Sequence, residues 1–172
     1  GILPAENFLA ALRESMGPVS FWSFPTLACF NASDALIQFL GLGGALLSLF
    51  LIAGIAITPV LIVLWLFYLS VFTIGQVFMS YQWDILLLEV GFLAIFLTNR
   101  SSIILWLFRW LLFRLMFLSG AVKLLSGDAV WRNLTALNFH FETQPLPNML
   151  AWYAHQLPEW FHRTSVGAMF FI

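Results

Sequence analysis

The sequence predicts an all-α fold: a multi-pass transmembrane helical bundle with one interfacial polar-aromatic segment. Composition is the first observation behind this prediction. Of the 172 residues, 62% are hydrophobic and only 9% are charged, whereas charged residues make up about a quarter of a soluble domain. A water-soluble domain of this length could not bury so much apolar surface. The second observation is that the apolar residues gather in runs of bilayer-spanning length.

Charge and cysteine content exclude further classes. The net charge of −1 provides no basic face, so no nucleic-acid partner is expected. Cys29 is the single cysteine, which excludes an internal disulfide and leaves a spectator thiol. The chain begins with Gly1 and ends within an apolar run, so we expect an internal piece of a longer protein.

Residues 1–34 predict an interfacial segment with loops. The stretch NFLAALRES, residues 7–15, has apolar positions at helical spacing and is expected to form a short amphipathic helix that ends at Gly17 and Pro18. The aromatic, turn-rich stretch that follows is typical of the headgroup zone, where tryptophan rings settle.

Residues 35–125 predict the membrane bundle, with about four helices. The first two apolar runs, 35–54 and 59–79, are joined by a few residues and therefore predict an antiparallel hairpin. The third run, 81–97, is short for a span and predicts a short, tilted or re-entrant helix. The fourth run, 103–125, is long enough to cross the bilayer.

Four charged residues lie inside the third and fourth runs, Asp84, Glu89, Arg109 and Arg114, and a fifth, Lys123, lies near the end of the fourth. A charge at the bilayer centre costs at least about 2.5–3.5 kcal/mol, so these side chains should face protein or water rather than lipid. We expect structural ion pairs between neighbouring helices. The alternative is a polar cavity in which Lys123 and Glu89 act as base and acid on a lipid or quinone-like substrate. Near the end of its run, Lys123 also has the option of reaching the interface.

Residues 126–165 predict an interfacial segment that holds all three histidines, His140, His155 and His162. Prolines at 145 and 147 forbid a helix through them, and Asn148 is expected to cap a short helix that ends before Pro158. We expect that helix to lie in the headgroup layer with its apolar face down. Residues 166–172 are expected to begin a further membrane helix.

The segment shows no recognisable catalytic or metal motif. His140 and Glu142 would point the same way in an extended chain, but their spacing matches no zinc pattern, and neither H-E-x-x-H nor G-x-S-x-G occurs. No metal and no cofactor are therefore expected. A transport role ranks last, because the sequence lacks an internal repeat.

Four stretches together resemble the lipase maturation factor family: GILPAENFL (1–9), SYQWDILLLEVGFLAIFL (80–97), FRWLLFRLMFLSGAVKL (108–124) and the long run from Gly127 to Arg163. The family's motif residues carry over to Trp83, Glu89, Trp131, Arg132, His140, Glu142, Thr143, Gln144, Pro145 and Pro147, and the same run contains His155 and His162. We regard this set as the candidate interaction residues.

The resemblance implies a multi-pass protein of the endoplasmic reticulum membrane, or of the inner membrane if the source is bacterial. Such a protein assists the folding, assembly and maturation of secreted lipases in a chaperone-like way and is not an enzyme. Membrane lipids and secreted lipases are its implied partners. A fainter likeness, through Lys123, Asp128 and Trp131, points to the membrane domain of vitamin K-dependent carboxylases and provides the enzymatic alternative.

Two indications disagree about which side of the membrane each end of the bundle faces. If all four complete runs cross, the positive-inside rule places the side of Lys123 in the cytoplasm, whereas the family resemblance places the segment at 138–163 in the lumen. Three glycosylation sequons, at Asn31, Asn99 and Asn133, would report the side that each occupies.

Overall fold

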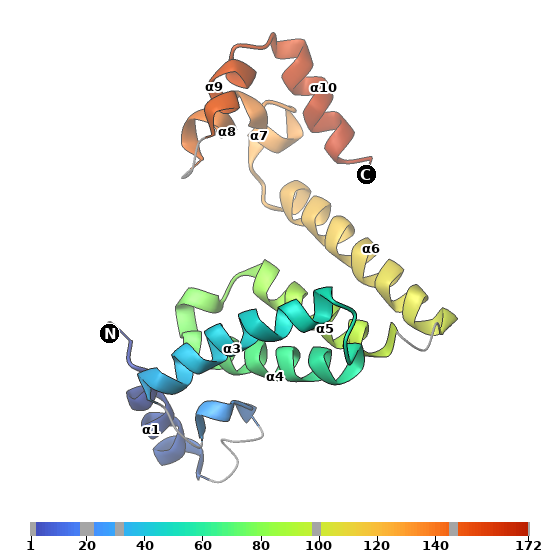
Figure 1. Cartoon of the computed structure of the whole chain (residues 1–172). Helices are drawn as coiled ribbons and strands as arrows, with labels where there is room; N and C mark the ends of the chain where they lie inside the picture. Colours follow the sequence, from blue (N-terminus) through green and yellow to red (C-terminus); the bar gives the residue numbers. More distant parts are fainter. Residues whose placement is uncertain (1–2, 18–22, 30–32, 98–100, 145–147, 172) are drawn as a thin grey trace. The chain divides into compact units, whose positions relative to one another are not determined.

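The computed structural model describes residues 3–17, 23–29, 33–97, 101–144 and 148–171, and within these ranges it consists of helices without a strand (Figure 1). The prediction of an all-α fold is confirmed for this part of the chain. The chain forms two compact units, Gly1–Phe108 and Arg109–Ile172, each described in turn below.

Three stretches are helical, long and apolar enough to cross a membrane: Asp34–Ile52, Ile57–Met79 and Ser102–Leu125. They correspond to α3, to α4 (Ile57–Gly75) with its 3-10 extension η3 (Gln76–Met79), and to α6. At 1.5 Å per residue, the 19 residues of α3 are about 28 Å long, close to the roughly 30 Å thickness of the hydrocarbon core. Apolar composition and length together confirm a multi-pass membrane protein.

The predicted hairpin is formed by α3 and α4, which pack against each other (Figure 1). Ser33 caps α3 by accepting a hydrogen bond from the Leu36 backbone N–H. The helix ends in a Schellman motif: Ile55 N–H donates to Phe50 O at 2.9 Å and Gly54 N–H to Leu51 O at 3.0 Å. Gly54 has a φ of +72°, a conformation that glycine adopts without steric penalty, so the chain reverses here within a few residues.

The second helix of the hairpin differs from the expected range of 59–79 at both ends. It begins at Ile57, so Pro59 lies within the first turn. Backbone N–H groups of the first turn make no hydrogen bond within the helix, so a proline there costs none. The regular helix then stops at Gly75, because Gln76 has a positive φ of +50° and the chain tightens into η3.

The third run forms α5, Gln82–Leu97, which packs on α4. Its 16 residues are about 24 Å long, less than the hydrocarbon thickness, as the prediction of a short helix requires. The indole N–H of Trp65 on α4 donates to the Leu88 carbonyl on α5 at 2.9 Å, and the Trp65 and Phe92 rings lie 5.6 Å apart. These contacts fix how the two helices face each other.

The N-terminal segment packs against α4. It forms the expected amphipathic helix α1, Ala5–Met16, which ends at Gly17, and a 3-10 turn η2, Leu27–Cys29. Apolar residues of α1, η2 and α4 make one buried cluster, which consists of Ala5, Leu9, Ala28 and Ile74. The Ser70 hydroxyl accepts from the Leu27 N–H at 2.9 Å, and the Thr26 hydroxyl donates to the Ser70 carbonyl at 3.3 Å.

The helix α6 begins in the first unit and continues into the second, where four short helices follow it. They are α7 (Ala129–Arg132), α8 (Ala136–Thr143), α9 (Met149–His155) and α10 (Glu159–Met169), and we call them the terminal helical cluster. Within it, α8 packs on α9 and on α10. The cluster buries Ala136, Ala151, His162 and Val166.

The expectation that a further membrane helix starts near Val166 stays a prediction. Val166 is fully buried within α10, which already begins at Glu159 after Pro158. Proline suits the position immediately before a helix, and Glu159 adds a favourable negative charge to the first turn. Val166 therefore belongs to α10, an amphipathic helix that packs on α8.

Candidate functional site

The residues of the family motif lie mostly in the terminal helical cluster, so this cluster is the candidate functional site. The connection from α6 is short: α6 ends at Leu125 and α7 begins at Ala129. Asp128 starts α7 by accepting a hydrogen bond from the Val130 N–H at 3.0 Å. In the turn after α7, Leu134 has a φ of +59° and the Thr135 N–H donates to the Val130 carbonyl at 2.8 Å.

Glu142 of α8 and His155 of α9 form the polar contact between these two helices. His155 Nε2 lies 3.0 Å from Glu142 Oε1, so the tautomer with a proton on Nε2 donates to the carboxylate. His155 Nδ1 is buried and accepts no hydrogen bond among the described residues. The pair joins two motif positions that the intervening prolines separate in sequence.

His162 of α10 lies inside the cluster. Its exposed fraction is 4%, and its ring centroid is 5.9 Å from that of Phe141 on α8. Two further atoms, His162 Nδ1 and Asn138 Oδ1, are buried without a hydrogen-bond partner in the described part of the chain. Unlike a purely apolar core, the interior of this cluster therefore holds polar atoms that the described residues leave without a hydrogen bond, which is unusual in proteins.

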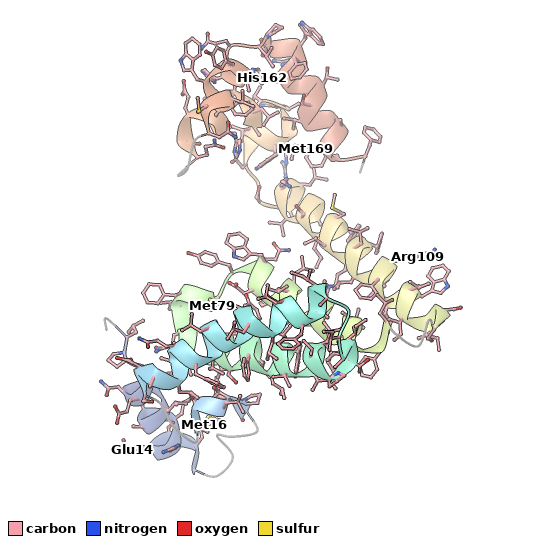
Figure 2. The ribbon with its side chains drawn as sticks, viewed as in Figure 1. Glu14, Met16, Met79, Arg109, His162 and Met169 are labelled. Carbon is pink, nitrogen blue, oxygen red and sulfur yellow. The ribbon has the colours of Figure 1, made fainter. Side chains whose placement is uncertain are left out.

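Aromatic side chains of the same helices stay exposed. We call the following residues the aromatic set: Phe139, Trp152, Tyr153, Trp160 and Phe161. Trp152 and Tyr153 have ring centroids 5.1 Å apart, and those of Trp160 and Phe161 are 6.0 Å apart. Figure 2 shows side chains projecting outward from α9 and α10 around the labelled His162. The set offers a large, rigid contact area, and its tryptophan and tyrosine members add polar N–H and O–H groups.

Asn148 caps α9 as expected. Its side-chain oxygen accepts from the N–H groups of Leu150 and Ala151, both at 2.9 Å. The helix α9 packs against the protein through the face that carries Ala151. Leu150 and Tyr153, which belong to the expected apolar face, are exposed. That face is therefore available to lipid or to a partner.

His140 and Glu142 do not lie in an extended chain, because α8 runs through both. Residues two apart on a helix point in different directions, so the parallel arrangement considered for these two side chains is wrong. Thr143 donates to the Phe139 carbonyl at 3.0 Å, and the Gln144 N–H to the His140 carbonyl at 3.0 Å, which closes the helix. Pro145 and Pro147 lie outside the described residues.

Asp84 has a hydrogen-bond partner on the neighbouring helix α4, and its expected pairing with a cation stays a prediction. It lies in the first turn of α5, is 6% exposed, and its Oδ1 accepts a hydrogen bond of 2.7 Å from the Tyr68 hydroxyl on α4. Its Oδ2 has no hydrogen-bond partner among the described residues. Tyr68 was missed by sequence analysis, because only the rotation of α4 against α5 brings the two residues together.

The other intramembrane charges are distributed between the units. Glu89 lies on α5 in the first unit, and Arg109 and Arg114 lie on α6 in the second, and each has an interaction partner. Pairing of Glu89 with these arginines stays a prediction. Trp83 is two-thirds exposed on α5, where its ring stacks on that of Tyr81 at 4.7 Å.

Lys123, the base of the enzymatic alternative, is held by groups of its own unit. Its Nζ lies 2.9 Å from the Ser119 hydroxyl one helical turn earlier and 5.4 Å from the Trp131 ring centroid. This cation–π contact connects α6 to α7. Arg132 and Asn133 are exposed beside Trp131. Within the described ranges, no three His, Cys, Asp or Glu side chains gather as metal ligands would.

These features define a polytopic α-helical membrane protein whose spans are followed by a small helical cluster with aromatic side chains outside and polar ones inside. The chain belongs to the lipase maturation factor family, because the model of the lipase maturation factor transmembrane domain matches residues 1–172. The expected family membership is thus confirmed.

Curated relatives agree. The chain is 43% identical to lipase maturation factor 2 of Xenopus tropicalis, 40% identical to that of Homo sapiens, and 38% identical to human lipase maturation factor 1. Each match covers 100% of this chain and, in the same order, 27%, 28% and 34% of the relative. The chain therefore spans about a quarter to a third of these relatives' length. No solved structure matches it. The comparisons give no support to the carboxylase alternative.

Proposed function

We propose that this chain is the membrane part of a factor that assists the maturation of secreted lipases, in a chaperone-like and non-enzymatic way. Family membership over all 172 residues is the observation that carries the proposal. Within its own unit, the Lys123 ammonium group contacts the Ser119 hydroxyl and the Trp131 ring.

The terminal helical cluster is the proposed client-binding part. Only residues 126–128 separate it from α6, and three extended residues reach about 10 Å, so the cluster stays at the bilayer surface next to a membrane span. At that depth, tryptophan and tyrosine rings are stable because they present both an apolar body and a polar tip. A folding lipase subunit with exposed apolar surface would find the aromatic set there.

The proposed location is the endoplasmic reticulum membrane, with the cluster on the lumenal side, where secreted lipases fold. In a bacterial host, the equivalent location is the inner membrane. The exposed Asn133 provides a marker for this side, since its sequon Asn-Leu-Thr is modified only in the lumen.

The test is to co-express the full-length protein with a secreted homodimeric lipase in cells that lack their own factor and to measure secreted lipase activity. We expect the wild-type protein to raise it and the double substitution Trp152→Ala and Trp160→Ala to lower it. The matched control is Met149→Ala with Met169→Ala, which removes exposed apolar side chains from the same two helices. No gain with the wild-type protein would refute the function, and equal losses in both variants would refute the role of the aromatic set.

A further inference from the structure

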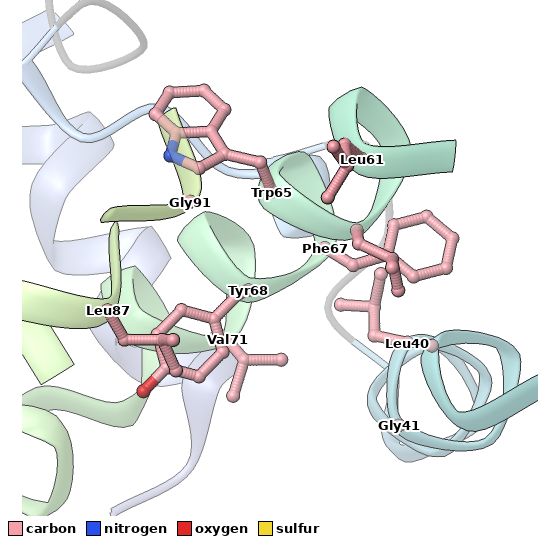
Figure 3. Close-up of a pocket in the computed structure, with 11 residues that line it drawn as sticks. Leu40, Gly41, Leu61, Trp65, Phe67, Tyr68, Val71, Leu87 and Gly91 are labelled. Atoms are coloured by element: carbon pink, nitrogen blue, oxygen red, sulfur yellow. The ribbon is translucent and has the colours of Figure 1, made fainter. Parts of the chain in front are cut away.

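The first unit contains an apolar groove that the lipase-maturation proposal does not use. It lies between α3, α4 and α5, and Figure 3 shows its lining. Its volume is about 410 Å³, within the range of roughly 300–1,000 Å³ typical of small-molecule sites. Leu40, Leu61, Leu64, Phe67, Val71 and Leu87 form much of its wall.

The two lining side chains that carry polar groups turn those groups toward protein. Trp65 donates its indole N–H to the Leu88 carbonyl at 2.9 Å, and Tyr68 donates its hydroxyl to Asp84 at 2.7 Å. What both side chains present along the groove is ring surface. The groove therefore suits a hydrocarbon ligand and offers little to a charged or strongly hydrated one.

Glycines supply the space. Gly41 and Gly44 on α3 and Gly91 on α5 line the groove without side chains. A Cβ added at Gly41 would meet no atom within 4 Å, and one at Gly44 would meet only ordinary contacts, 3.9 Å from Leu64 Cδ2 and 4.0 Å from Phe67 Cδ2. A larger side chain at position 44 would therefore not be excluded by its Cβ, and the effect of glycine there is to leave space beside α4.

The groove is as long as one leaflet is deep. Its lining on α4 extends from Leu61 to Val71, ten residue steps or about 15 Å along the helix axis. The hydrocarbon core is roughly 30 Å thick, so one leaflet is about 15 Å deep. Because α3 and α4 have the length and composition of membrane spans, the medium around the groove is acyl chains.

We propose that this groove holds one acyl chain of a membrane phospholipid as a bound, structural lipid. The chain fills the space left by Gly41 and Gly44, and its headgroup stays at the bilayer surface. Such a lipid would join α3 to α5, two helices that each pack on α4.

The experiment uses the full-length protein in vesicles of phosphatidylcholine that include a phosphatidylcholine with a photoactivatable diazirine in one acyl chain. After illumination, peptide mapping identifies the labelled residues. We expect label concentrated on Leu64, Val71 and Leu87 and retained when the protein is extracted into detergent before illumination. Label spread evenly over the lipid-facing residues, or lost on extraction, would show ordinary solvating lipid and overturn the proposal.

Gly44→Leu should remove the groove label down to background, because the added side chain occupies the space of the acyl chain. The matched control is Ala45→Leu, which adds the same side chain to an exposed neighbouring position of α3 outside the groove and should leave the label unchanged. If Gly44→Leu does not fold, as judged by thermal unfolding, Gly41→Leu replaces it. Label that survives a folded groove variant contradicts the proposal.

The labelling experiment also distinguishes two other possible occupants of the groove. A groove covered by another helix of the full-length protein or by a partner would take no label from phosphatidylcholine, and the proposal would be wrong. If a free fatty acid that carries the same diazirine labels the groove and the phospholipid does not, the ligand is a free acid and the proposal is equally wrong.

Discussion

Removal of one hydroxyl group, in Tyr68→Phe, tests the polar contact between α4 and α5 in the first unit. The Tyr68 hydroxyl is the one hydrogen-bond donor to Asp84 recorded among the described side chains, at 2.7 Å, and the Asp84 Oδ2 already lacks a partner. Because Asp84 is 6% exposed, water cannot replace the lost donor. A hydrogen bond to a charged group contributes about 1.5–3 kcal/mol, so we expect the free energy of unfolding to fall by that amount.

The assay is an unfolding titration of the full-length protein in mixed micelles, carried out as a double-mutant cycle with Asp84→Leu. Tyr68→Phe leaves the Asp84 carboxylate without its donor, and Asp84→Leu leaves the Tyr68 hydroxyl without its acceptor. The double substitution removes both groups and should be nearly neutral. The control is Tyr81→Phe, the same chemical change at an exposed tyrosine, which should leave stability within about 0.5 kcal/mol of the wild type. If Tyr68→Phe destabilises no more than this control, or if the two single effects simply add, the reasoning is refuted.

The remaining predictions concern the terminal helical cluster. Asn148→Ala should destabilise it by about 1 kcal/mol and Asn148→Asp by much less, because aspartate keeps the cap; thermal unfolding compares the two. Val166→Ala should lower the unfolding free energy by about 1.5–3 kcal/mol, whereas Met169→Ala, at an exposed position of the same helix, should change it little. Glu142→Gln should lower it by less than about 1 kcal/mol, since the carboxylate is largely exposed, and a larger loss would show a stronger pair. In a glycosylating host, Asn133→Gln should abolish one mobility shift on electrophoresis; no shift in the wild type would contradict the lumenal placement.

The sequence was sufficient for the long helices because each is encoded locally. Apolar runs of the required length predicted α3, α4 and α6, and the shorter run before residue 97 predicted a short α5. Asn148 was predictable for the same reason, since a cap depends only on the residues that follow it.

Features that depend on how helices rotate against each other were not predictable. Asp84 on α5 accepts a hydrogen bond from Tyr68 of α4, a contact that no local pattern encodes. The burial of Val166 is a second such feature. The sequence pattern did not show that a helix begins after Pro158, packs on α8 and buries Val166.

The docking of the N-terminal segment against α4 affects how the protein is made. Thr26 bonds to Ser70, 44 positions later in the chain, so its partner does not yet exist when it leaves the ribosome. At roughly 5–20 residues per second, translation takes about 2–9 s to supply the missing half of this contact. During that delay the surface of α4 against which α1 packs, and with it the Ile74 side chain that joins the buried cluster of Ala5 and Leu9, has not yet been synthesised.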